Sequence, residues 1–263
     1  MLLLIDAGNT RVKWALAEEC GPGAGAADAG WGRWAAAGAA GHAELAHLAT
    51  AWRAAKPSRI LISNVAGAAV REALDRLLEG AAGAGASQAE WFKSAPQRGS
   101  VRNAYRDPAQ LGCDRFASAI GARAQFPGQP LLIVTCGTAT TIDALTADGV
   151  FLGGMILPGL DLMAAALASN TAQLPQVAQQ TAAITPFADN TADAIASGCI
   201  AAQTGAIEHA LGALNKRHGA ARCILSGGAA GRVAPHLQVP CSMVENLVLI
   251  GLQVVAMEQD PSC

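Results

Sequence analysis

The sequence predicts an α/β fold that contains one strand–turn–strand unit twice. Short apolar runs, such as Leu2–Asp6 and Leu131–Cys136, alternate along the chain with segments of helical composition. The stretch LLLIDAGNTRVKWAL at Leu2–Leu16 also matches LLIVTCGTATTIDAL at Leu131–Leu145 without a gap. Since 52% of the 263 residues are hydrophobic and only 14% are charged, the chain can bury a sizeable core.

The expected elements follow one another as strands, helices and breaks rich in Gly or Pro. We expect strands at Leu2–Asp6, Arg11–Leu16, Trp31–Ala37, Arg59–Val65, Leu131–Cys136 and Arg222–Leu225. We expect helices at His42–Ala55, Ala69–Leu78 and Asp114–Gln125; Pro57 and Pro127 follow the first and the third. The Ala/Gly-rich stretches Gly21–Gly30 and Gly80–Ser87 are interpreted as surface loops.

Charge and cysteine content exclude several classes of protein. The net charge is −2 and there is no basic tract, so we expect no binding to nucleic acid or to an anionic membrane. No signal peptide and no apolar run of about 18 residues or more is found. The seven cysteines are scattered without a C-x-x-C pair, which indicates reduced thiols in a cytoplasmic protein.

The repeated unit is interpreted as a true duplication. Five positions of the overlay are identical, namely Leu2/Leu131, Leu3/Leu132, Gly8/Gly137, Ala15/Ala144 and Leu16/Leu145. Two apolar strands can resemble each other by chance, but here the turn glycine is in register and small polar residues follow it in both copies.

A glycine turn of this kind can bind an anion, because its backbone N–H groups can face a common point. Two such turns facing each other across a cleft could bind the phosphates of one nucleotide from both sides. Asp6 suits a Mg²⁺ bound through water, and Lys13 could reach a terminal phosphate. The candidate residues are Asp6, Ala7, Gly8, Asn9, Thr10, Arg11, Val12 and Lys13 in the first unit and Thr138 in the second. The alternative for a single copy is a purely structural hairpin.

A further nucleotide contact is expected at Gly227 and Gly228, which follow the strand Arg222–Leu225. A pair of glycines there permits close approach of a flat ring such as adenine. An ordinary turn between a strand and a helix explains the pair equally well. No G-x-x-x-x-G-K-[ST] motif is present, so a P-loop is excluded.

The motifs DAGNTRVKW, LGCDR and CGTATTID, in this order, resemble the actin-like ATPase and sugar kinase superfamily. With Tyr105–Pro108, Gly153–Gly159 and Asn190–Ile195, the chain more narrowly resembles type III pantothenate kinases. The resemblance implies a duplicated ribonuclease H-like fold, with one half at 1–112, the other at 113–263 and a nucleotide cleft between them. It also implies a homodimer that uses ATP with Mg²⁺ to phosphorylate pantothenate, the first step of coenzyme A biosynthesis.

Asp114 is the candidate catalytic base. Its position after a glycine at the start of a helix fits a helix N-cap equally well. Kinase chemistry, however, needs an acid residue that orients or accepts the proton of the acceptor hydroxyl. The resemblance implies that the aspartate of G-x-D-R has this role.

The resemblance also assigns the residues that contact pantothenate. They are Tyr105, Gly112, Cys113, Asp114, Arg115 and Thr191. Arg115 offers a planar fork that matches a carboxylate, whereas Cys113 is expected to contribute its backbone and not its thiol. Without the resemblance, Tyr105 would be interpreted as a half-buried ring and Thr191 as a helix cap.

Thr135 departs from the family pattern. Members often carry an acid at this position, two residues before the second turn glycine, where it binds K⁺ or NH₄⁺. A threonine supplies a neutral oxygen, so we expect the monovalent cation to bind more weakly here or through carbonyls.

The sequence is also compatible with two other functions. The first is a superfamily kinase for another small hydroxylated substrate, such as a sugar or acetate. The second is a regulatory accessory factor for gene expression that binds ATP without turnover. Intact Asp6, Lys13 and Asp114 favour catalysis.

Overall fold

The computed structural model describes residues 1–18, 30–79, 89–171, 174 and 184–258. The expected loops Gly21–Gly30 and Gly80–Ser87 therefore lie outside the described residues, apart from Gly30. The chain forms two compact units: unit 1 is Met1–Gly128, Gly149–Leu152 and Asn246–Cys263, and unit 2 is Gln129–Asp148 and Gly153–Glu245. The division into halves 1–112 and 113–263 stays a prediction.

Unit 1 is built on a five-stranded sheet with the order β3-β2-β1-β4-β5. Its strands are β1 (Leu2–Ala7), β2 (Arg11–Ala17), β3 (Ala36–Gly41), β4 (Arg59–Asn64), β5 (Glu90–Trp91), β6 (Gln97–Arg98) and β7 (Val101–Asn103). Its helices are η1 (His42–His47), α1 (Leu48–Ala55), α2 (Ala68–Leu78), η2 (Pro108–Gln110), α3 (Cys113–Gln125) and α7 (Leu247–Glu258).

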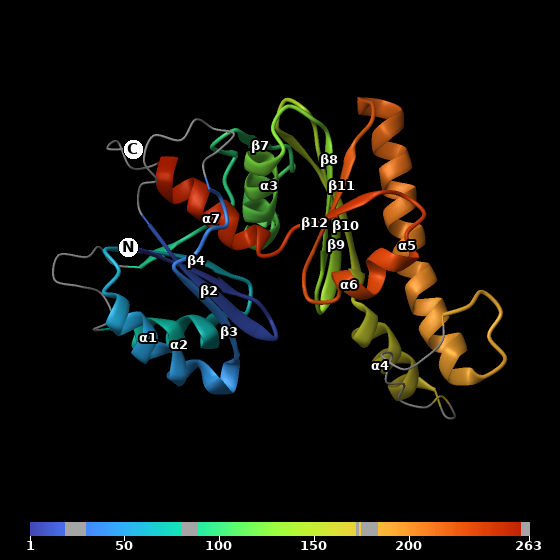
Figure 1. The fold of residues 1–263 in the computed structure, drawn as a ribbon, viewed down its shortest axis with the longest axis horizontal. Coiled ribbons are helices and arrows are strands. Elements are labelled where there is room, and N and C mark those ends of the chain that lie inside the picture. The colour runs from blue at the N-terminus through green and yellow to red at the C-terminus, as the bar shows by residue number, and fades with distance from the viewer. Residues whose placement is uncertain (19–29, 80–88, 172–173, 175–183, 259–263) are drawn as a thin grey trace. The chain divides into compact units, whose positions relative to one another are not determined.

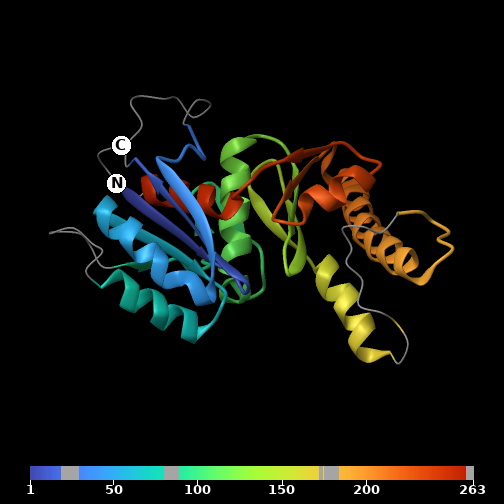
Figure 2. The same ribbon diagram turned by 60° about the horizontal axis from the view of Figure 1, so that its bottom comes forward.

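The central strand β1 is buried on both faces, which explains why its sequence is a continuous apolar run rather than an alternation. Leu3 and Ile5 pack into a core with Trp52 and Leu74, from α1 and α2. Figures 1 and 2 show α1 and α2 along this face of the sheet, and α7, which contacts β1 and β4, along the other. Asp6 ends the apolar run and alternates away from the core that contains Ile5.

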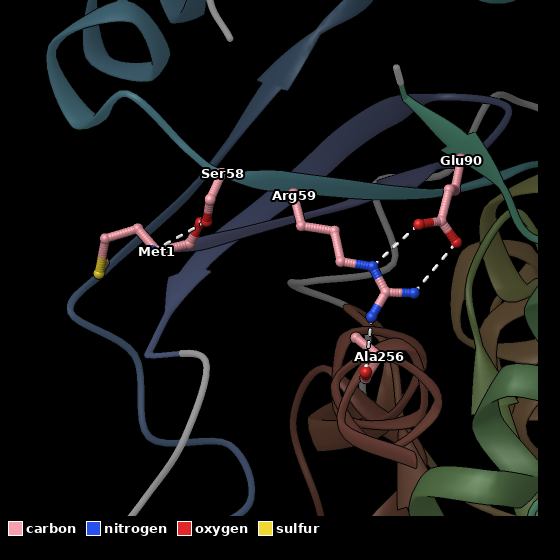
Figure 3. Close-up of polar contacts among 5 residues, drawn as sticks. All are labelled: Met1, Ser58, Arg59, Glu90 and Ala256. Carbon is pink, nitrogen blue, oxygen red and sulfur yellow. Dashed lines mark hydrogen bonds and ion pairs between the residues drawn. The ribbon is translucent and has the colours of Figure 1, made fainter. Parts of the chain in front are cut away.

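An arginine at the start of β4 ties three elements of unit 1 together (Figure 3). Arg59 donates through Nε and Nη2 to the carboxylate of Glu90, at 2.9 and 3.1 Å, and through Nη1 to the carbonyl of Ala256 at 2.6 Å. The last contact satisfies a carbonyl in the final turn of α7, where positive charge is favourable. Next to it, Ser58 Oγ donates to the Met1 carbonyl at 2.9 Å, which fastens the first residue.

Unit 2 repeats the arrangement of unit 1 in the strands β12-β11-β8-β9-β10, which are the first five of a seven-stranded sheet whose order continues with β7 and β6. Its strands are β8 (Leu131–Cys136), β9 (Ala139–Leu145), β10 (Val150–Pro158), β11 (Arg222–Ser226) and β12 (Cys241–Met243). Its helices are α4 (Leu160–Asn170), α5 (Thr191–His218), α6 (Ala230–Val233) and η3 (Ala234–His236). The first residues of β10 belong to unit 1, where Val150 and Phe151 pair in parallel with β7.

The five strands of the first sheet correspond to five of the second. In each set, the first strand pairs antiparallel with the second and parallel with the fourth. The third and fifth strands flank these, with β3, β5 and β12 at sheet edges, whereas β10 also pairs with β7. This is the order expected for a duplicated ribonuclease H-like fold, so the predicted fold class is confirmed.

The gapless overlay of the two hairpins is wrong in the return strand. In the overlay, Leu145 corresponds to Leu16 and Leu131 corresponds to Leu2. Leu16 pairs with Leu3, whereas Leu145 pairs with Leu131, so the return strand of the second hairpin is shifted by one residue. The cause is a shorter second turn: the N–H of Gly8 donates to the Arg11 carbonyl, whereas that of Gly137 donates to Ala139. The first strands and the turn glycines do correspond.

The third strand was also predicted in the wrong place. The expected strand at Trp31–Ala37 begins instead at Ala36 and ends at Gly41, over the sequence AAGAAG. Alanine and glycine have little intrinsic preference for strands, and here pairing with β2 decides. Gly38 lies opposite Trp14, and a Cβ at Gly38 would lie 2.9 Å from Trp14 Nε1, so the indole needs a glycine beside it.

Helices α3 and α7 approach until their backbones touch. A Cβ at Gly251 would lie only 1.9 Å from the Ala117 carbonyl oxygen, and one at Gly121 would lie 2.5 Å from the Leu247 oxygen. Ala117 and Gly121, four apart on α3, and Gly251 on α7 are small enough to permit this approach. The contact fixes α3, whose first turn carries the predicted catalytic residues.

We expect Gly251→Ala to lower the free energy of unfolding by about 1–3 kcal/mol, because the methyl group forces the two helices apart. The matched control is Gly212→Ala in α5, where a Cβ meets nothing within 4 Å. Removing a helical glycine there should raise stability by about 0.5–1 kcal/mol. Urea denaturation of both variants measures the difference, and equal effects would contradict the proposed backbone contact.

Candidate active site

The first hairpin brings three polar side chains together at the end of β1. Asp6 pairs with Lys13 across the antiparallel ladder and lies beside Ser63 in the parallel register with β4. Paired residues on neighbouring strands share a face, so the three side chains point to the same side of the sheet. The predicted turn residues Gly8, Asn9 and Thr10 follow directly, with Asn9 and Thr10 exposed.

The carboxyl group of Asp6 has an unusual affinity for protons. Its pKa is raised to about 7, chiefly by burial and also by the charge of Asp114, while Lys13 opposes the rise. Asp6 and Asp114 therefore face a common region in which negative charge accumulates. A divalent cation or a protonated group relieves such repulsion.

Asp114 lies in the first turn of α3 and is not its cap. Gly112 occupies the N-cap position and Cys113 begins the helix, so Asp114 is the second helical residue. Its Oδ1 accepts the N–H of Arg115 at 2.8 Å, and a Cβ at Gly112 would lie 2.7 Å from that oxygen. The N-cap alternative for Asp114 is therefore wrong, and Gly112 is needed to make room for the carboxylate.

Burial also raises the pKa values of Asp114 and of the neighbouring thiol of Cys113. For Asp114, the Arg115 N–H and the Arg115 charge oppose the rise; for Cys113, hydrogen bonds from its surroundings do. Cys113 Sγ lies 3.3 Å from Ser63 Oγ and 3.5 Å from the Asn64 carbonyl. A thiol with a raised pKa is a poor nucleophile, which agrees with the expected backbone role of Cys113.

Arg115 and Tyr105, both predicted substrate residues, contact each other. Arg115 is 7% exposed as a residue, and its Nη1 donates to Tyr105 Oη at 2.9 Å. Its guanidinium lies 5.8 Å from the Tyr105 ring centroid and 5.9 Å from that of Phe151. Asn103 fixes the loop, since its Oδ1 accepts the N–H of Tyr105 at 3.0 Å. The tyrosine ring is thus held between a strand and the start of α3.

The second hairpin, in unit 2, has a neutral version of the first site. Thr135 stands at the position of Asp6, pairs with Thr141 at the position of Lys13, and lies beside Ser226 at the position of Ser63. Thr141 Oγ1 is buried and has no hydrogen-bond partner in the described part of the chain. Thr138 lies in the exposed turn between β8 and β9.

Gly227 and Gly228 differ in their surroundings. Gly227 has a φ of 93° and packs on the end of β8, where a Cβ would lie 2.3 Å from the Cys136 carbonyl. Glycine at 227 is therefore required by the protein's own backbone. At Gly228 a Cβ would meet nothing within 4 Å, so open space is available for a ligand. Its contact with adenine stays a prediction.

Thr191 is the first residue of α5, and the cap is its neighbour Asn190, whose side chain accepts the N–H of Asp193 at 3.0 Å. The cap alternative for Thr191 is therefore wrong. Its exposed side chain lines a mainly apolar pocket of about 1050 Å³ in unit 2, together with Met163, Leu167 and Ile195.

Sequence reasoning missed several residues that support the site. Ser63 and Phe151 contact predicted site residues from distant elements, Asn103 contacts Tyr105 two residues away, and His42 Nε2 lies 2.9 Å from the Gly8 carbonyl oxygen. The only available signal was polarity at the end of an apolar strand, as in Ser63. The other contacts depend on long-range packing.

Three more expectations concern cysteines, metals and membranes. Five described cysteines are free, namely Cys113, Cys136, Cys199, Cys223 and Cys241, while Cys20 and Cys263 lie outside the described residues. No group of three or more His, Cys, Asp or Glu side chains in the described ranges could hold a metal ion. None of the helices described here is long and apolar enough to cross a membrane.

Solved structures of other proteins share this fold. The structure of a glucokinase from an Antarctic psychrotroph aligns with 98% of this chain and over 99% of its own length. The TM-score is 0.52 and the sequence identity is 13%. A protein assigned to the Baf family of transcriptional activators, from Campylobacter jejuni, covers 99% with all of its length, a TM-score of 0.62 and 16% identity. The chain thus has the actin-like ATPase and sugar kinase fold.

The model of the type III pantothenate kinase family matches residues 2–212. The type III pantothenate kinase of Herminiimonas arsenicoxydans is 57% identical over 265 aligned residues, which cover all of both chains. The chain belongs to the type III pantothenate kinase family.

We expect Asp6→Asn to stabilise the free protein in a way that depends on pH. Because the folded-state pKa of Asp6 is raised to about 7, the folded state binds a proton more tightly than the unfolded state between pH 4 and 7, and wild-type stability falls as pH rises. The variant does not lose stability in this way. Its free energy of unfolding should therefore exceed that of wild type by on the order of a few kcal/mol above pH 7, and the difference should vanish near pH 4.

Thermal unfolding between pH 4 and 8.5, without nucleotide or metal, measures this difference. Glu72→Gln, which removes an exposed carboxylate on α2, is the control and should give a flat difference. An Asp6→Asn variant that is no more stable than wild type above pH 7 would contradict the raised pKa of Asp6.

Proposed function

We propose that this chain is a pantothenate kinase, which transfers the γ-phosphate of ATP to pantothenate and yields 4′-phosphopantothenate and ADP. The observation that carries the proposal is the start of α3. There a partly buried carboxylate, Asp114, faces the Asp6 hairpin on one side, while the next residue, Arg115, is hydrogen-bonded to Tyr105. The family membership supports the same reaction, the first step of coenzyme A biosynthesis.

ATP phosphates would bind at the two glycine turns, at Gly8–Thr10 and at Thr138, with Lys13 as a point charge for the terminal phosphate. Gly228 offers open space for the adenine. Mg²⁺ suits Asp6, because the two mutually repelling carboxylates of Asp6 and Asp114 favour a nearby cation. When bound with ATP, Mg²⁺ would neutralise charge that develops on the phosphate oxygens.

Asp114 would act as the general base. Burial raises its pKa, so it holds a proton more tightly than an exposed aspartate and is better matched to the weakly acidic hydroxyl of the acceptor. Its Oδ1 is already oriented by the N–H of Arg115, which leaves the other carboxylate oxygen to accept the proton.

Arg115, Tyr105 and Thr191 would bind the substrate. The Arg115 guanidinium is held in place by Tyr105 Oη and offers a planar fork for the pantothenate carboxylate. Gly112 and Cys113 would contribute backbone, and the exposed Thr191 a hydroxyl.

The decisive experiment is ADP release by purified protein with ATP, Mg²⁺ and pantothenate. We expect Asp114→Asn to lower kcat by about 10²–10⁴-fold, because Asn keeps the acceptor for the Arg115 N–H but cannot take the proton. Asp75→Asn, on the exposed side of α2, is the matched control and should keep full activity. Equal rates for Asp114→Asn and wild type would contradict the assignment.

Further arms of this experiment separate the alternatives. Turnover with a sugar or acetate in place of pantothenate would favour another kinase activity, and ATP binding without any turnover would favour a regulatory factor. Parallel assays with and without K⁺ or NH₄⁺ test the expected cation. Only weak activation is expected, because Thr135 offers a neutral oxygen where family members often carry an acid.

A homodimer is the proposed assembly, and the cytoplasm the proposed compartment. Large apolar side chains are exposed on β10 and α4, namely Met155 at 38%, Ile156 at 64%, Leu162 at 48% and Leu167 at 38%. Large apolar side chains exposed to this extent are the observation that supports an interface at these two elements.

We expect Ile156→Asp to weaken the dimer at least about tenfold, since each burial of isoleucine contributes about 1.5–3 kcal/mol and a two-fold axis doubles the loss. Sedimentation equilibrium measures it, with Met243→Asp, 52% exposed on β12, as the control. Wild-type protein that is monomeric at micromolar concentration would contradict the dimer.

A further inference from the structure

A histidine from a distant element contacts the turn of the first hairpin, Gly8–Thr10, which is the proposed phosphate site. His42 Nε2 lies 2.9 Å from the carbonyl oxygen of Gly8, 34 positions away in the sequence. A carbonyl oxygen can only accept a hydrogen bond, so Nε2 carries the proton and donates. The imidazole is partly buried, which shields this contact from competing water.

The fold brings His42 to the turn through β3. Gly41, the last residue of β3, pairs with Arg11, the first residue of β2 after the turn. The chain then enters η1, whose start is capped because the Gly41 N–H donates to Glu44 Oε2 at 3.3 Å. His42 is the first residue of η1 and therefore lies level with the turn.

The contact determines how the turn presents its backbone. A peptide group is planar and trans, so a fixed Gly8 carbonyl fixes the N–H of Asn9 in the opposite direction. The preceding peptide is fixed as well, because the Gly8 N–H donates to the Arg11 carbonyl at 3.1 Å. With His42 on the carbonyl side, the Asn9 N–H points away from the histidine.

The second hairpin has a support at the same topological position. Gly159 follows β10, as His42 follows β3, and a Cβ there would lie 2.1 Å from the Gly137 carbonyl oxygen. Its N–H also donates to the Thr138 carbonyl at 2.8 Å. The second turn is thus supported by backbone, whereas the first is supported by a side chain that can be changed alone.

We infer that His42 is a positioning residue for ATP binding: its hydrogen bond to Gly8 holds the Asn9 amide in the orientation that binds a phosphate of ATP. This inference rests on the proposed function only in taking the first turn as an ATP site. The hydrogen bond orients the turn, and this role requires no contact between His42 and ATP.

Three variants test the inference. His42→Phe keeps a planar ring but has no donor, His42→Gln keeps a donor at similar reach, and His47→Phe changes an exposed histidine of the same helix η1 as a control. We expect His42→Phe to raise the Kd for the Mg²⁺ complex of a non-hydrolysable ATP analogue, and the KM for ATP, by about three- to tenfold. The KM for pantothenate should stay unchanged, and His42→Gln should recover most of the loss.

The inference is overturned if His42→Phe binds the analogue within twofold of wild type, or if His42→Gln is impaired as much as His42→Phe. An equal rise in both KM values, or a similar defect in His47→Phe, would also overturn it, since each would indicate a general structural effect. Thermal unfolding checks that all variants fold. Because analogue binding needs no pantothenate, a failed kinase assay leaves this test intact.

Discussion

The backbone contact between α3 and α7 is the constraint on which the rest of unit 1 depends. Gly121 and Gly251 let the two helices touch, and α7 in turn is tied to β4 through Arg59. The position of α3 along the sheet is therefore fixed, and its first turn lies beside the end of β1. A larger residue at either glycine would displace that turn, and a displacement of about 1 Å is enough to weaken catalysis strongly.

Duplication supplies two hairpins whose first strands and turn glycines correspond but whose electrostatic characters differ. The first copy has Asp6 and Lys13 at the positions where the second has Thr135 and Thr141. Charge is thus confined to the copy that lies next to Asp114, where Asp6 is pushed towards protonation by burial and repulsion. In the second copy the corresponding positions carry neutral hydroxyl groups.

Strong local patterns made much of the fold predictable. The apolar runs of β1, β4 and β8 and the helix α3 begin and end close to the expected residues, because burial on both faces leaves a continuous hydrophobic signal. Strand β3 was misplaced because AAGAAG carries no such signal and becomes a strand only through Trp14. The one-residue shift between the hairpins also escaped detection, since it is set by turn hydrogen bonds.

The sequence by itself determined the doubled hairpin, the position of the acid at its tip and the G-x-D-R segment that carries Asp114, because these are contiguous in the chain. Tertiary structure alone decided which distant groups support them. It brings His42 to Gly8, Tyr105 to Arg115 and Ser63 to Cys113. These contacts, like the raised pKa of Asp6, arise from packing between elements far apart in the sequence, which no local pattern encodes.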